Sequence, residues 1–154
     1  MSISHLTKRG GALLSGALIL GIGVAIPAWA STGSGTFATI APTGASFTNG
    51  QWWFDPWPCN SSCVSGTYSG WNYSGTLADT AADGDYVYTQ GKTDGYDWAT
   101  PRVEFHGGAG NSTFVSQDIY DPNGDPATQG QLQVCRQRNN FPDDCKQSGW
   151  KYRS

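Results

Sequence analysis

Aromatic side chains gather in one short stretch of the chain, residues 51–58 (QWWFDPWP), and they could hold a ligand. Flat indole faces stack on sugar rings, and a neighbouring carboxylate accepts hydrogen bonds from hydroxyl groups. Two prolines in the stretch argue against a regular central strand, and exposed aromatic patches usually mark contact sites. We therefore predict a binding face for an extracellular glycan or a secreted protein. Its predicted residues are Trp52, Trp53, Trp57 and Asp55.

The alternative is that the aromatic residues fill the hydrophobic core. Leu, Ile and Val are scarce after residue 30, whereas Trp and Tyr are plentiful. Each buried aromatic ring removes a large apolar area from water, so such rings could replace the missing aliphatic side chains. For any single Trp, this core role competes with the binding role.

Two acidic segments could in principle bind Ca²⁺, which prefers oxygen ligands. The second of them has its glycine too early for an EF-hand, and no bidentate Glu follows. Asp, Asn and Gly are also the ordinary residues of turns. We therefore expect solvated turns, no metal site and no cofactor. The residues concerned are Asp79, Asp83 and Asp85 in the first segment and Asp121, Asn123 and Asp125 in the second.

Catalysis would depend on His106, the one histidine after residue 30, or on Glu104, the one glutamate. A serine hydrolase would need a nucleophile, but no Gly-x-Ser-x-Gly elbow is present. A glycosidase would need two carboxyl groups across a cleft, and sequence spacing does not place them. The run Gly107–Gly110 lacks the third glycine and the following helix of a dinucleotide site. We predict no catalytic residue, with a small secreted hydrolase as an alternative.

Residues 1–30 have the three parts of an export signal. Lys8 and Arg9 are basic, residues 11–26 are uncharged and apolar, and Ala28-Trp29-Ala30 matches a signal-peptidase motif. The apolar run is about 16 residues long, whereas a membrane-spanning helix needs about 20. We expect cleavage after Ala30, no membrane association afterwards, and a secreted, extracellular protein.

The exported part carries seven basic and twelve acidic residues, a net charge of −5. Nucleic-acid binding and anionic membrane surfaces require clustered Lys and Arg. No such cluster exists in the sequence. We therefore exclude nucleic acid and a polybasic membrane contact as partners.

The four cysteines all follow the signal, and export makes disulfide bonds the expected state. Three pairings are possible, and we prefer the local ones. The alternative is a zinc site, but only the first pair has the usual short spacing of zinc ligands. The preferred disulfides are Cys59–Cys63 and Cys135–Cys145.

The mature chain predicts an all-β domain, a small antiparallel β-sandwich or barrel with two disulfides. Gly, Asp, Thr, Tyr and Trp are abundant, while typical helix formers are rare. We expect a flexible arm over 31–50, with one edge strand near 36–40, and a β domain over 51–154. About six to eight short strands separated by turns fit that class. The main candidates are 66–76, 86–90, 101–106, 112–120, 130–136 and 150–153, with Val103, Phe105, Leu132 and Val134 facing inward.

Three segments together resemble a group of small secreted actinomycete (Streptomyces-like) proteins without an assigned activity. They are Asp79-Thr80 with Asp83-Gly84-Asp85-Tyr86-Val87-Tyr88, Gly124 to Val134-Cys135-Arg136, and Pro142-Asp143-Asp144-Cys145 through Trp150. The resemblance covers about residues 63–150. It implies a Gram-positive, extracellular setting and no particular chemistry.

Our leading functional prediction is a non-catalytic extracellular binding module, for carbohydrate or a cell-wall glycan. A small secreted inhibitor of a hydrolase is the first alternative. Gly70-Trp71-Asn72-Tyr73 is similar to the Trp-Arg-Tyr loop of streptomycete amylase inhibitors, although the Arg is absent and the cysteine pattern differs. The hydrolase using His106 or Glu104 is the second alternative.

Overall fold

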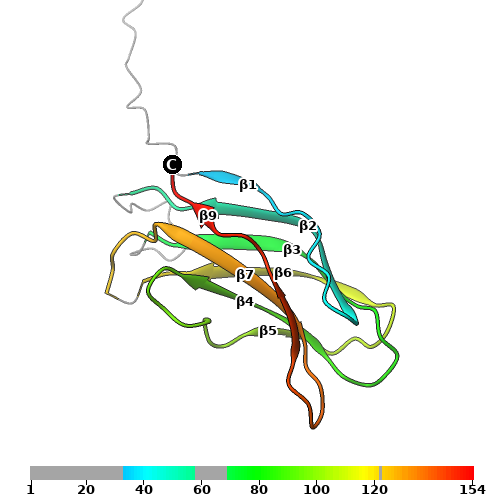
Figure 1. Cartoon of the computed structure of the whole chain (residues 1–154). Coiled ribbons are helices and arrows are strands. Elements are labelled where there is room, and N and C mark those ends of the chain that lie inside the picture. Colours follow the sequence, from blue (N-terminus) through cyan, green and yellow to red (C-terminus); the bar gives the residue numbers. More distant parts are fainter. Residues whose placement is uncertain (1–32, 58–68, 122) are drawn as a thin grey trace, which may run out of the picture.

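The computed structural model describes residues 33–57, 69–121 and 123–154, and these residues form two antiparallel sheets with no helix among them (Figure 1). The described part of the chain is therefore all-β, as predicted. Its strands, in order, are β1 (Ser34–Thr36), β2 (Ala45–Phe54), β3 (Trp71–Asp79), β4 (Val87–Thr93), β5 (Val103–Phe105), β6 (Ser112–Ile119), β7 (Gln129–Arg136), β8 (Asp144–Gln147) and β9 (Lys151–Tyr152).

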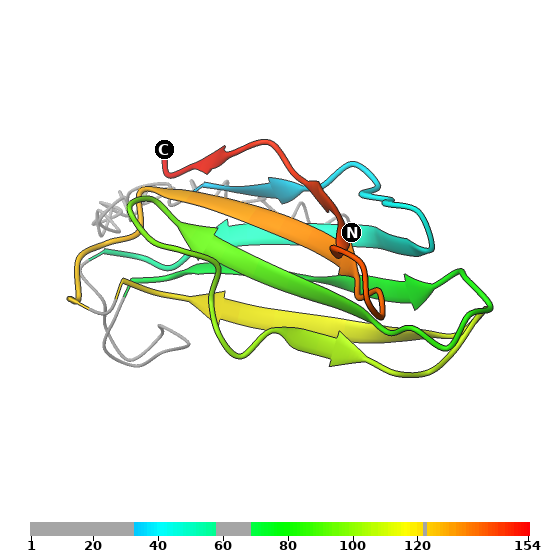
Figure 2. The same cartoon turned by 60° about the horizontal axis from the view of Figure 1, so that its bottom comes forward.

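The first sheet, which we call sheet A, has the order β1-β2-β3-β6. The second, sheet B, has the order β5-β4-β7-β8, and β9 pairs with another part of β7. The chain crosses between the sheets after β3, after β5 and after β6, so β6 and β7 join strands far from them in sequence. The two sheets face each other in the edge view of Figure 2.

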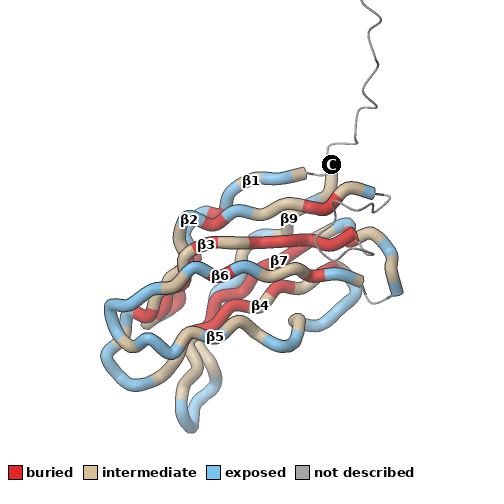
Figure 3. The backbone as a smooth tube through the Cα atoms, turned by 180° about the vertical axis from the view of Figure 1, so that it is seen from behind, coloured by how far each residue is buried: buried red, intermediate tan, exposed pale blue. Residues whose placement is uncertain are grey.

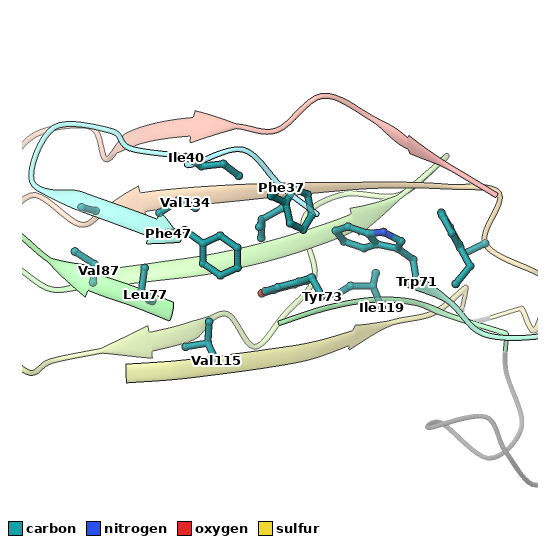
Figure 4. Packing of buried hydrophobic residues seen from close by; sticks show 14 residues of the cluster. Phe37, Ile40, Phe47, Trp71, Tyr73, Leu77, Val87, Val115, Ile119 and Val134 are labelled. Carbon is teal, nitrogen blue, oxygen red and sulfur yellow. The ribbon is translucent and has the colours of Figure 1, made fainter. Parts of the chain in front are cut away.

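Aromatic rings fill much of the space between the sheets (Figure 4). Trp71 and Tyr73 of β3 are fully buried, with ring centroids 5.6 Å apart, and Phe37 meets the indole edge-on at 6.5 Å. Leu132 and Val134 of β7 face this core, as predicted. The core interpretation of the aromatic residues is therefore correct for these rings, because few large aliphatic side chains compete for the interior.

Two glycines of sheet B make room for Trp71. A Cβ atom at Gly91 would lie 2.7 Å from Cζ3 of the indole, and one at Gly130 would overlap the indole itself. Gly91 on β4 pairs directly with Leu132, and Gly130 is two residues away on the same β7 strand. The indole thus occupies volume that side chains of sheet B would otherwise take.

The expected flexible arm over 31–50 is wrong in its described part, residues 33–50. This segment contributes β1 and the first half of β2, and Phe37, Ile40 and Phe47 are buried in the core. The expected edge strand lies at Ser34–Thr36 rather than 36–40. The small residues between the apolar anchors let β1 pair closely with β2. Because β2 runs over Ala45–Phe54, the predicted domain boundary at residue 50 falls inside this strand.

The prolines after β2 end this strand rather than exclude it. Strand β2 pairs with both neighbours, and its last ladder partner is Phe54, opposite Trp71. A register shift between Thr48 and Gln51 accommodates Asn49, whose φ is 51°. Proline is harmless where no further ladder hydrogen bond is needed. The sequence pattern therefore misplaced the effect of Pro56 by a few residues.

Burial follows the sheets, as the red segments of the tube in Figure 3 show. Strand β3 lies between two neighbours and is buried along most of its length, whereas the edge strand β5 is only half-buried. Val103 and Phe105 of β5 pack against the core, as predicted from their alternation with polar residues. Strand β8 and the long β2 are the two elements that the sequence pattern did not predict.

One of the two predicted disulfides is present. Cys135 and Cys145 lie directly opposite each other on β7 and β8, joined by an S–S bond of 1.99 Å. Cys59 and Cys63, like the expected signal over residues 1–30, lie outside the described residues. In the described part of the chain, no helix is long and apolar enough to cross a membrane.

The packing of Trp71 against Gly130 gives a test of the core. We expect Gly130→Ala to lower the free energy of unfolding by about 1–3 kcal/mol, because the added methyl group overpacks the indole. Gly149→Ala is the matched control, since a Cβ atom there meets nothing within 4 Å, and it should change stability by less than about 0.5 kcal/mol. Equal stability of both variants in urea denaturation would contradict this packing.

Candidate functional site

The four predicted binding residues do not share one face. Trp52 and Trp53 are neighbours on a paired strand, so their side chains point to opposite faces of sheet A. The Trp52 indole packs against the core, with its centroid 6.0 Å from that of Phe54. Trp57 is 49% exposed and lies beyond the end of β2.

Asp55 is buried and has a structural environment. Its Oδ1 accepts a hydrogen bond from Nδ2 of Asn72 at 3.0 Å, and its Oδ2 accepts one from the Gly70 backbone N–H at 3.2 Å. Burial raises the pKa of this carboxyl group, and the two hydrogen bonds and Arg153 act against that rise. Asp55 was predicted to bind a ligand, but its carboxylate oxygens thus accept hydrogen bonds from within the protein.

Arg153 closes this end of the molecule. Its Nη1 donates to the Asp55 carbonyl oxygen at 2.6 Å, its Nη2 to Oγ of Ser69 at 2.7 Å, and its Nε to the Ala127 carbonyl oxygen at 2.7 Å. The guanidinium carbon also lies 5.0 Å from the centroid of the Phe54 ring. One side chain therefore ties the ends of β2, β3 and β7 together.

The predicted alternation in β5 is confirmed: Arg102, Glu104 and His106 share the face away from the core. Glu104 accepts hydrogen bonds from Nε of Arg102 at 2.6 Å and pairs with Nε2 of His106 at 3.0 Å. These two partners lower the pKa of Glu104. A glycosidase acid needs a raised carboxyl pKa, so this geometry favours an ionised, structural Glu104.

Two tyrosines complete that cluster on sheet B. The Arg102 guanidinium lies 4.2 Å from the ring centroid of Tyr88 and also bonds the Tyr86 hydroxyl. The Tyr86 ring stacks on His106 at 4.3 Å. Tyr88 donates to Asp143 at 2.6 Å, and burial together with this carboxylate raises its pKa to about 12. The polar groups of the cluster are mostly paired with one another.

The segment that resembles an inhibitor loop is not displayed. Trp71, Asn72 and Tyr73 are each fully buried in β3. An inhibitory loop must reach into another protein, which a central buried strand does not do. The inhibitor alternative therefore loses the residues on which it depended.

The acidic segments serve the fold. Arg136 binds both Asp83 and Asp85, and Asp121 accepts hydrogen bonds from the Asn123 N–H and the Tyr96 hydroxyl, each at 2.7 Å. Among the described residues, no group of three or more His, Cys, Asp or Glu side chains is arranged to hold a metal ion.

The structure assembles a different cluster of aromatic and polar side chains, which we call the aromatic hollow. It lies between the loop that joins β4 to β5 and the end of β6, and it has a volume of about 660 Å³. Figure 2 shows that loop, in light green, descending beside the yellow β6 strand. The residues of interest in its wall are Tyr96, Trp98, Tyr120, Asp97, Asp118 and Gln117.

Hydrogen bonds at both ends hold the loop of the aromatic hollow. At its start, the Asp94 carboxylate accepts bonds from Oγ1 of Thr128 at 2.8 Å and from the Gln129 N–H at 3.1 Å. In its middle, the Ala99 N–H donates to the Gly91 carbonyl oxygen at 2.8 Å. At its end, Nε2 of Gln117 donates to the Pro101 carbonyl oxygen at 2.9 Å. The aromatic side chains of this loop are thus presented by a fixed backbone.

Gln117 also connects the hollow to the core. Its Oε1 lies 2.8 Å from the buried hydroxyl of Tyr73, which in turn lies 2.8 Å from Oγ1 of Thr89. Because Oε1 only accepts, Tyr73 donates to Gln117 and accepts from Thr89. Burial raises the pKa of Tyr73, so this hydroxyl stays protonated and keeps donating.

Sequence spacing did not identify the aromatic hollow. Tyr96 and Trp98 follow the Asp94-Gly95 turn, whereas Asp118 and Tyr120 lie at the far end of β6. Long-range strand pairing brings these segments together, and single-sequence periodicity carries no information about it. The usable signal was the pair of aromatic residues in a loop, where no core role requires them.

No known protein family, curated protein or solved structure matches this chain.

The anchor of the loop at Asp94 gives a pH-dependent prediction. Although burial raises the pKa of Asp94, hydrogen bonds from Thr128, Thr93 and Gln129 lower it below 3.8 overall. The ionised form therefore stabilises the folded chain above that pH, and this contribution is lost as the pH falls through the lowered pKa. Asp94→Ala should cost about 1–2 kcal/mol at neutral pH, and the difference from wild type should shrink in acid.

The measurement is urea denaturation of both proteins between neutral pH and pH 3. Asp97→Ala is the control, because its exposed side chain lies in the same loop. A stability difference that stays constant over the whole pH range would show that the Asp94 carboxylate is not the anchor.

Proposed function

We propose that the chain is a non-catalytic extracellular binding module for carbohydrate, with the aromatic hollow as its site. The lining of the hollow includes three aromatic residues, an amide and two carboxylates, and this composition carries the proposal. Sugar rings stack on aromatic faces, and amide and carboxylate groups bind hydroxyl groups. The volume falls within the usual range of small-ligand sites.

The extracellular setting is supported by the signal-like N-terminal sequence and by the Cys135–Cys145 disulfide, since such bonds persist in oxidising compartments. We further propose a β-sandwich in which a second disulfide, Cys59–Cys63, constrains the segment after Trp57. Phe54, Trp71 and Ile119 lie in one cross-strand row. Trp57 therefore lies at the same end of the sheet as Tyr120.

A binding role suits the groups of this site better than catalysis does. The pKa of Glu104 is lowered, and the hydrogen bond of His106 goes to that carboxylate rather than to a hydroxyl nucleophile. Neither residue borders the aromatic hollow. The proposal therefore assigns Glu104 and His106 to the surface of sheet B.

Pulldown on insoluble polysaccharides tests the proposal. We expect wild type to be retained on at least one of cellulose, chitin, xylan or peptidoglycan. Trp98→Ala and Tyr120→Ala should each weaken retention by about tenfold or more, because central aromatic contacts dominate binding free energies. If the site extends from Tyr120 to Trp57 at the same end of sheet A, Trp57→Ala should weaken retention as well.

Two exposed phenylalanines provide controls. Phe114 is 71% exposed on sheet A. Phe141 is 64% exposed and follows the last residue of β7, whereas the loop of the aromatic hollow is bonded to the first residue of that strand. Phe114→Ala and Phe141→Ala should leave retention unchanged, and thermal melting should confirm that all variants fold. Equal retention of all variants would reject the aromatic hollow as the site, and absence of retention on every polysaccharide would reject carbohydrate binding.

A further inference from the structure

The outer face of sheet B, which points away from the core, carries polar side chains in cross-strand rows. Gly91 of β4 and Leu132 of β7 face the core. Their neighbours Lys92 and Gln131 therefore point outward, and these two residues are direct cross-strand partners. The next row, across β4, β7 and β8, consists of Gln90, Gln133 and Gln147. Amide groups and one ammonium group thus share this face.

Two indole rings flank the ammonium group of Lys92. Its Nζ atom lies 4.6 Å from the ring centroid of Trp98 and 5.1 Å from that of Trp150. Trp98 belongs to the loop between β4 and β5, and Trp150 directly precedes β9, so three separate segments meet at this group. Lys92 forms no salt bridge with any residue that the structure describes. Its charge therefore has no counter-charge within the described part of the chain.

The two rings prepare this ammonium group for a negatively charged partner. Cation–π contacts hold the group in place. The rings also keep water from part of its surface, and opposite charges attract more strongly where water is excluded. Trp has no hydrogen-bond acceptor atom, so the N–H groups of Lys92 stay available to an oxygen acceptor. The arrangement therefore suits a carboxylate group of a ligand.

Hydrogen bonds fix the amide groups beside Lys92. Nε2 of Gln131 donates to the Ser148 carbonyl oxygen at 2.8 Å, and Nε2 of Gln133 donates to Oε1 of Gln90 at 2.9 Å. Gln131 and Gln133 are only 8% and 7% exposed. Oε1 of Gln131 accepts no hydrogen bond from a described residue, so it is available to a hydroxyl group of a ligand.

A hollow of about 540 Å³ continues this face beyond Gln90, and its wall includes Thr100, Arg102 and Glu104. Arg102 is not a competing anion site, because Glu104 accepts a hydrogen bond from it at 2.6 Å. Lys92 has no such carboxylate partner. The hollow therefore adds space for a ligand beside the cation without adding a second unpaired charge.

The overall charge of the chain narrows the class of ligand. Residues 31–154 carry seven basic and twelve acidic side chains, a net charge of −5, so the chain as a whole does not attract polyanions. A negative ligand group must then be recognised locally, at Lys92. The amide acceptor and the aromatic rings beside it suit a ring that bears hydroxyl groups.

We propose that the outer face of sheet B, at Lys92 and Trp150, binds a sugar acid, that is, a hydroxylated ring that bears a carboxylate. Lys92 binds the carboxylate, Gln131 accepts a hydrogen bond from a hydroxyl group, and Trp150 contacts the ring. None of these three residues borders the aromatic hollow. The face is therefore a second site, and the inference does not rest on carbohydrate binding in the hollow.

Isothermal titration calorimetry at neutral pH tests the charge preference. The probes are trimers of galacturonate and of mannuronate, each compared with its uncharged methyl ester. We expect at least one acid to bind about tenfold or more tightly than its ester, the difference expected for a hydrogen bond between charged groups. Added salt should reduce this preference.

Variants of the outer face locate the site. Lys92→Met removes the charge but keeps a side chain that packs between the indoles, so it should abolish the preference for the acid. Lys92→Arg keeps the cation and should retain the preference. Lys146→Met is the matched control, because it removes the same charge from the exposed strand β8 and should change nothing. Trp150→Ala should weaken binding of the acid by about tenfold, and thermal melting verifies that each variant is folded.

The outcomes separate this site from the aromatic hollow. Tyr120→Ala, which alters the hollow, should leave binding of the sugar acid unchanged, and loss of binding in that variant would overturn the assignment to sheet B. Equal affinity for acid and ester, a preference that survives Lys92→Met, or no binding of either acid would also overturn the inference, whatever the result of the polysaccharide pulldown. Displacement of the sugar acid by an equal concentration of inorganic phosphate would overturn it by showing that any anion suffices.

Discussion

The packing of one indole between the two sheets is the contact on which the rest of the structure depends. Trp71 belongs to sheet A, but the space that it fills is provided by Gly91 and Gly130 of sheet B. Its neighbours Phe37 and Tyr73 extend the aromatic layer along the interior. The chain has few large aliphatic residues, and it fills its core by placing large rings of one sheet opposite glycines of the other. The volumes of the two sheets are therefore complementary.

This contact also determines where the aromatic hollow lies. Trp71 is paired with Ile119, and the Ile119 side chain crowds the same glycine, Gly91, from another direction. Ile119 points inward and itself borders the hollow, as does Gln117 on the same face of β6. The loop that carries Trp98 is bonded to that same Gly91 through its carbonyl oxygen. The wall of the hollow is therefore continuous with the core.

Local patterns predicted those parts of the fold that local physics controls. Alternation identified the inward faces of Val103 and Leu132, and proximity identified the Cys135–Cys145 bond. The stretch before Pro56 was misjudged, because the effect of a proline depends on which backbone N–H groups still need partners.

Local sequence patterns could not predict the aromatic hollow, because its residues come from distant parts of the chain. Trp52 and Trp53 are adjacent in sequence and separated by the sheet, whereas Trp98 and Tyr120 are distant in sequence and joined by it. Alternation along β2 decides the first relationship, and the packing of the β4–β5 loop beside the end of β6 decides the second. Neither composition nor spacing encodes that long-range packing in a single sequence.

The strand order has a kinetic consequence. Sheet A gains its last strand when β6 joins β3, and the two parts of sheet B meet when β7 joins β4, so each sheet needs the closure of a long loop. Folds dominated by such non-local contacts reach their native state slowly. During that interval β3 and β4 each expose an unpaired edge, which another unfolded copy can occupy. The same topology that builds a site from remote segments therefore makes the yield of native protein depend on how dilute the chain is while it folds.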